Sequence, residues 1–65
     1  NNMTLTDKDI RLNNLKLKEL RRQMDTLSKQ LDAIEDTDPF WIEKSENTKA
    51  EMFSVWGQIK QVKSL

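Results

Sequence analysis

A hydrophobic seam between Ile10 and Ile34 constrains the fold of this chain more than any other feature. Two rows of residues recur at intervals of seven and are offset by three, which is the a/d pattern of a helix packed along another helix. The rows are Ile10, Leu17, Met24 and Leu31, and Asn13, Leu20, Leu27 and Ile34. Because water cannot satisfy an apolar stripe of this length, a second helix must cover it.

The first helix is predicted at about residues 7–35. Thr6 has a side chain suited to the N-cap, where its oxygen accepts a hydrogen bond from the backbone amide of Asp9. Acidic residues in the first turn also interact favourably with the positive end of the helix dipole. Residues 1–5 show no periodicity, and we expect them to lie outside the helix.

A second helix is predicted at about residues 39–64, after a loop at 36–38. Pro39 disfavours helical angles in the residue before it but fits the first position of a helix, and Asp38 is then the natural N-cap. This segment has its own seam with alternating spacings of four and three, namely Trp41, Ser45, Thr48, Met52, Val55, Ile59 and Val62. The short loop predicts that residues 1–65 form a single domain, an antiparallel helical hairpin.

The register of the hairpin follows from the two seams. If Ile34 lies beside Trp41, core positions meet along the whole hairpin, with Leu20 beside Val55. We assign the self-association seam to the apolar positions of both rows: Ile10, Leu17, Leu20, Met24, Leu27, Leu31, Ile34, Met52, Val55, Ile59 and Val62. Asn13 is the polar exception, which either fixes the register or contacts water near the open end.

A chain of 65 residues needs stabilisation beyond its own small core. It contains no Cys and no His, so neither disulfides nor the common zinc and di-iron sites can supply it. Self-association remains, and we predict an all-α, coiled-coil-like hairpin that forms a homodimeric four-helix bundle. The alternative is a trimer of hairpins with the first helices at its centre.

Further apolar residues lie beside the seams and widen the hydrophobic faces beyond what one partner helix covers. They are Ile42, Phe53, Trp56, Leu12 and Leu15. One interpretation places them in the dimer core. The other makes the aromatic pair, with Ile42, an anchoring site for a different protein.

Charge provides the alternative functional class. Eleven basic and eleven acidic residues cancel, which argues against a protein built chiefly to neutralise phosphates. The densest basic cluster nevertheless offers an alternative nucleic-acid face formed by Lys18, Arg21 and Arg22. Binding to phosphate would weaken steeply with salt, whereas apolar helix packing would not.

The composition argues against catalysis and cofactor binding. Without His or Cys, and with a single glycine, the chain offers neither an activated nucleophile nor a phosphate-binding loop, so we expect no enzyme. We expect no metal site, because the acidic residues near the loop lack the glycine-centred calcium pattern. We also expect no cofactor and no small-molecule substrate. No apolar run could span a membrane, which indicates a cytoplasmic protein. The predicted function is protein–protein interaction, as an oligomerisation module or small adaptor.

Overall fold

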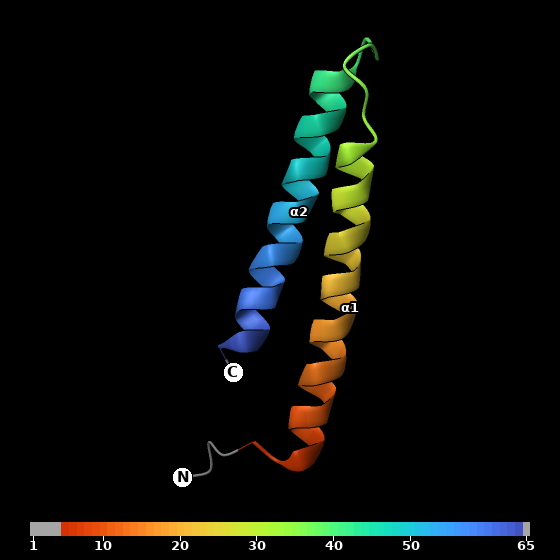
Figure 1. The fold of residues 1–65 in the computed structure, drawn as a ribbon. Helices are drawn as coiled ribbons and strands as arrows, with labels where there is room; N and C mark the ends of the chain where they lie inside the picture. Colours follow the sequence, from red (N-terminus) through yellow and green to blue (C-terminus); the bar gives the residue numbers. More distant parts are fainter. Residues whose placement is uncertain (1–4, 65) are drawn as a thin grey trace.

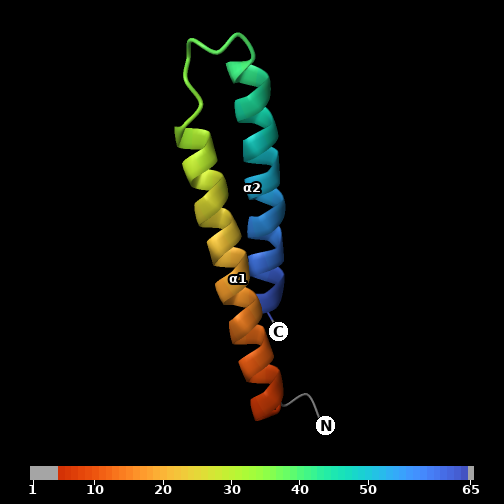
Figure 2. The same ribbon diagram turned by 90° about the vertical axis from the view of Figure 1, so that its right-hand side faces the viewer.

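The chain folds into two antiparallel helices, α1 (Asp7–Asp32) and α2 (Trp41–Lys63), in a computed structural model that describes residues 5–64. Figures 1 and 2 show the helices side by side, joined by a loop at one end. The hairpin is elongated, extending 56 Å along its longest axis and 9 Å along its shortest. The predicted all-α helical hairpin is therefore confirmed.

A reciprocal pair of hydrogen bonds fixes the start of α1. Thr6 Oγ1 accepts from the backbone N–H of Asp9 at 3.1 Å, and Asp9 Oδ2 accepts from the backbone N–H of Thr6 at 3.3 Å. This capping box satisfies two amides in the first turn, where no intrahelical acceptor is available. The predicted N-cap, Thr6, is confirmed. Residues 1–5 are expected to precede the helix, and of these the structure describes only Leu5.

The end of α1 differs from the prediction, because the helix stops at Asp32 and not at residue 35. Ala33 caps it, with its backbone N–H directed to the carbonyl of Lys29 at 3.1 Å. A longer helix would place Glu35 against the negative end of the helix dipole, which costs free energy. The earlier stop leaves this carboxylate in the loop.

The start of α2 also differs, because Pro39 lies in a turn and the helix begins at Trp41. The backbone N–H of Trp41 bonds to the carbonyl of Asp38 at 3.0 Å, which closes a turn around Pro39. Asp38 Oδ1 accepts from the backbone N–H of Phe40 at 2.8 Å. The N-cap of α2 is Phe40, without a side-chain cap hydrogen bond, so the predicted N-cap Asp38 is wrong. The Asp38 carboxylate instead binds the Phe40 amide from within the turn.

The connection between the helices consequently covers residues 33–40 in place of the predicted 36–38. Ile34 lies in this loop rather than in the helix, where it is half-buried. Its predicted neighbour Trp41 is exposed. The expected pairing at the loop end of the seam therefore does not form a buried layer.

The core of the hairpin lies along the middle of the predicted seams. Among residues 5–64, the buried hydrophobic side chains are Leu20, Val55 and Val62, with 4%, 7% and 7% exposed. Partly buried side chains pack against them, namely Leu17, Met24, Leu27 and Ile59. Leu20 and Val55, which the register predicts as neighbours, share this cluster.

The open end of the seam is less covered than predicted. Ile10 is exposed and Asn13 is half-buried. Figures 1 and 2 show that the first turns of α1 extend beyond the C-terminal end of α2, so no helix of the same chain covers Ile10. This part of the predicted seam therefore has no partner helix within residues 5–64.

Truncating the most buried side chain is expected to unfold much of the hairpin. Leu20→Ala removes a leucine that is 4% exposed, and such changes cost about 2 to 5 kcal/mol in a packed core. Leu15→Ala is the matched control, because it makes the same change in the same helix at a side chain that is 58% exposed. Circular dichroism during urea unfolding should show a much lower midpoint for the first variant only; equal midpoints would contradict this core.

Candidate protein-interaction surface

A shallow apolar hollow lies between the two helices on one side of the hairpin. We call this side the aromatic face. The residues that line the hollow are Met24, Leu31, Lys49, Met52, Phe53 and Trp56. Five of the six side chains are hydrophobic, so the hollow offers an apolar contact area with one cation at its edge.

Two aromatic rings form the most prominent part of this face. Phe53 and Trp56 are 72% and 46% exposed, and their ring centroids lie 5.9 Å apart in an edge-to-face arrangement with an interplanar angle of 62°. Lys60 places its ammonium nitrogen 4.5 Å from the centroid of the Trp56 ring. The edge-to-face contact and the cation–π contact hold the pair in place, which lowers the entropy lost when a partner packs on it.

The opposite side of the hairpin has a different character. Five of the seven residues that line its hollow are of polar or charged type, and we call this side the polar face. The residues that line it are Arg22, Gln23, Thr26, Leu27, Glu51, Ser54 and Val55. Buried against a partner, these polar groups would each need a hydrogen bond, so the polar face is less suited to apolar packing.

The structure divides the five residues predicted as a partner or dimer face. All five are exposed. Ile42 lies eleven residues before Phe53, which is about three helical turns and hence on the same side of α2. Leu12 and Leu15 lie elsewhere, since Leu15 is four residues before Glu19 and shares a helix stripe with the polar face. The predicted surface is thus two separate patches.

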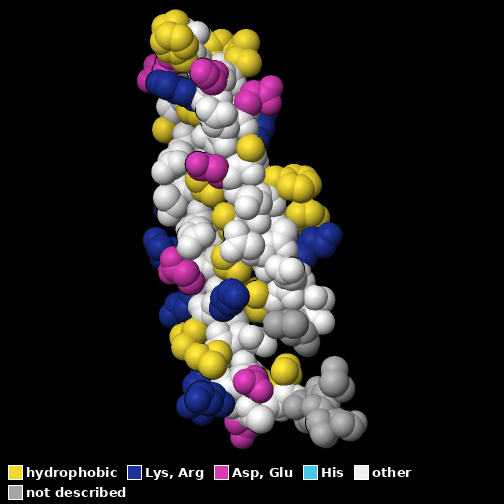
Figure 3. Space-filling view, turned by 180° about the vertical axis from the view of Figure 1, so that it is seen from behind, with side chains coloured by type: hydrophobic (Ala, Val, Ile, Leu, Met, Phe, Trp, Pro, Cys, Tyr) yellow, Lys and Arg dark blue, Asp and Glu magenta, His cyan; other side chains and the backbone are white. Residues whose placement is uncertain are grey.

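Of the four other large exposed apolar residues, Phe40 and Trp41 adjoin Ile42 at the loop, whereas Leu5 and Ile10 lie at the open end. Phe40 is not among the residues that the sequence predicts for a partner face. Figure 3 shows hydrophobic side chains in separate groups along the hairpin, with Lys and Arg concentrated toward the end that carries the termini.

The alternative nucleic-acid face is altered by an ion pair. Arg22 donates from Nη2 to Glu19 Oε2 at 2.6 Å and from Nε to Glu19 Oε1 at 3.0 Å. Lys18 and Arg21 are exposed. One of the three predicted cations is therefore engaged with a carboxylate of its own helix, which leaves a weaker basic cluster than the sequence suggests.

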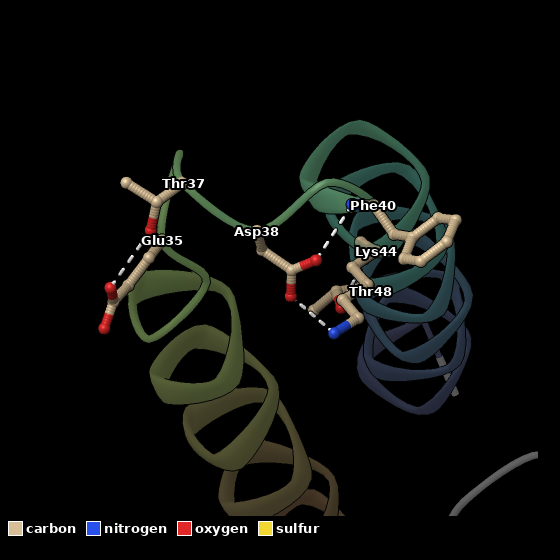
Figure 4. A network of polar contacts seen from close by, with 6 residues as sticks. All are labelled: Glu35, Thr37, Asp38, Phe40, Lys44 and Thr48. Atoms are coloured by element: carbon tan, nitrogen blue, oxygen red, sulfur yellow. Dashed lines mark hydrogen bonds and ion pairs between the residues drawn. The ribbon is translucent and has the colours of Figure 1, made fainter.

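A second polar network orders the loop end, as Figure 4 shows. Asp38 Oδ2 accepts from Lys44 Nζ at 2.5 Å, while its other oxygen accepts from the Phe40 amide. Together these two hydrogen bonds hold the pKa of Asp38 below its usual range. Within residues 5–64, no three acidic side chains converge where they could hold a metal ion.

Comparison of the chain with protein-family models, with curated proteins and with solved structures gives no match. Neither helix in the described part of the chain is long and apolar enough to cross a bilayer. The function must therefore be inferred from the surface of the hairpin.

Removing Arg22 is expected to raise the pKa of Glu19. The hydrogen bond from Arg22, aided by one from Gln23, lowers the pKa of Glu19 to about 2. Because the folded helix favours the carboxylate, this stabilisation is present above the ordinary glutamate pKa and is lost as the pH falls toward about 2.

Carboxyl chemical shifts recorded by NMR against pH should show the Glu19 midpoint moving toward the ordinary glutamate value in Arg22→Gln. Arg21→Gln is the matched control, since Arg21 makes no hydrogen bond to Glu19. Equal midpoints in the two variants would show that the ion pair does not form in solution.

Proposed function

We propose that this chain is a protein–protein interaction module whose aromatic face binds a second copy, so that two hairpins form a four-helix bundle. The observation that carries the proposal is the imbalance between core and surface. Among the described residues, three hydrophobic side chains are buried and nine large ones are exposed. Two helices alone cannot cover their apolar surface, and a second pair of helices in a bundle would.

The chemistry of the two faces supports the choice of surface. The aromatic face combines an apolar hollow with a preordered ring pair, and aromatic side chains contribute strongly to interfaces. The polar face carries the Glu19–Arg22 ion pair and several groups that would lose water on burial.

A second copy is the partner that supplies a matching apolar surface. Two-fold association brings the same patch together from both subunits, so an apolar hollow meets an apolar hollow. We expect the function to be binding rather than catalysis, either as an oligomerisation module or as an adaptor whose remaining surface contacts another protein.

Light scattering and circular dichroism on the same samples test this proposal. Across a roughly hundredfold concentration range we expect a dimer that keeps its helicity, because association and helix formation support one another. A monomer at every concentration would overturn the proposal, and a trimer would favour an arrangement with α1 at the centre.

Phe53→Ser is expected to weaken association about tenfold or more, since a central aromatic residue typically anchors an interface. Its side chain is 72% exposed in the hairpin, so the change should leave the fold of a single chain almost unaffected. Leu15→Ser on the polar-face side is the matched control. Sedimentation equilibrium gives both dissociation constants, and a similar loss in the two variants would argue against the aromatic face.

A further inference from the structure

Folding converts a chain without net charge into a strongly polarised rod. The open end, which comprises residues 7–22 and 56–63, carries eight Lys or Arg against three Asp or Glu. The loop end, residues 30–46, carries one against six. Between them, residues 23–29 and 47–55 carry two of each sign. The hairpin therefore has a positive end, a neutral middle and a negative end.

This polarity arises from the hairpin topology. Both ends of the chain contribute cations, and the antiparallel fold brings those ends together (Figure 1). The loop then gathers Asp32, Glu35, Asp36, Asp38, Glu43 and Glu46 at the opposite end, with Lys44 as the cation among them. Charges of one sign at each end repel a second hairpin aligned in the same direction and attract one aligned in the opposite direction.

The aromatic face lies at the level of the neutral middle. Met24, Met52 and Phe53 fall within the neutral segments, and Trp56 adjoins them. A two-fold axis that lies between two aromatic faces, perpendicular to the helices, would stack the two apolar hollows on each other. The same axis would place each positive open end beside the negative loop end of the other hairpin.

We infer that two copies pair antiparallel through their aromatic faces, with the two-fold axis near Phe53 and Trp56. The inference rests on the proposed self-association and adds its geometry. Apolar contact supplies the centre of the interface, and opposite charges at the two ends set the direction. An interface of this kind is closed, because both copies use the same patch.

The sequence of α2 specifies a register for this pairing. Its outward stripe alternates spacings of four and three, as a helix packing on another helix requires, through Ile42, Glu46, Lys49, Phe53, Trp56, Lys60 and Lys63. In the antiparallel register that sets Trp56 opposite Phe53 of the second copy, Lys63 lies opposite Glu46 of the second copy. One layer of this register is unfavourable, because it sets Lys49 opposite Lys60 of the second copy. The ammonium group of each Lys60 lies over the Trp56 ring of its own chain.

Charge reversal at the two ends of the stripe tests the direction. Glu46→Lys and Lys63→Glu should each weaken self-association about tenfold, because every dimer then contains two repulsive contacts in place of two attractive ones. An equimolar mixture of the two variants should recover the wild-type affinity to within about threefold, because each substituted side chain then meets its opposite. Glu51→Lys is the control, since it makes the same charge change in the neutral middle on the polar face.

A parallel pairing gives a different pattern. Residue 46 would then face residue 46 of the second copy, so a single reversal would exchange one repulsion for another and leave the affinity unchanged. A wild-type monomer would overturn the proposed self-association itself. A wild-type dimer in which both single reversals behave like Glu51→Lys would overturn the antiparallel direction alone.

Cysteine cross-linking gives an independent readout, because the chain contains no native cysteine. In the antiparallel register the two copies of residue 46 lie about 25 Å apart along the helix axis, too far for a disulfide. Oxidation of Glu46→Cys mixed with Lys63→Cys should therefore yield the mixed disulfide, and each variant alone should stay unlinked. Efficient linking of either variant alone would overturn the inference.

Discussion

One helix–helix contact covers a single stripe on each helix, and the surface of this protein follows from that limit. Leu20, Val55 and Val62 occupy the covered stripe and are buried. Apolar residues one or two positions away, such as Trp56 and Phe53, remain in water. Most helical stability in proteins comes from packing of an apolar face, so a hairpin with so small a core gains much from a second layer.

Polar contacts of Asp38 order the loop at one end of the covered stripe. Asp38 binds the Phe40 amide with one carboxylate oxygen and the Lys44 ammonium group with the other, and these contacts fix where α2 begins. This polar network is compatible with the packing that the two seams specify, in which Val55 and Leu20 share the buried cluster and Phe53 stays exposed.

The sequence predicts those parts of the fold whose signal is local or periodic. The Thr6 cap depends on residues three apart, and the middle of the seam depends on a repeat that any pairing of these helices must bury. The loop was harder to predict, because Pro39 is compatible with either a turn or a first helical residue. The turn closed by the Trp41 amide and the Asp38 carbonyl decides between them.

The candidate surface was predictable in its composition but not in its arrangement. Leu12, Leu15 and Phe53 all lie beside a seam, but a residue beside a seam can lie on either side of it. The charge pattern is hidden in the sequence for a related reason. The net charge of zero sums over segments that the hairpin separates, whereas counting by position along the hairpin reveals two opposite ends.

The separation of the two apolar patches bears on the size of the proposed assembly. If the patch at Leu12 and Leu15 bound the aromatic face of another copy, the contact would join unlike surfaces and could extend into filaments. The Glu19–Arg22 pair beside these leucines opposes this, since removing the ion pair from water would cost free energy and offset the apolar gain. In the proposed assembly, pairing of like aromatic faces would use up the apolar hollow on both copies and would stop at two. The polar face would then remain in water, where its charges would oppose further association.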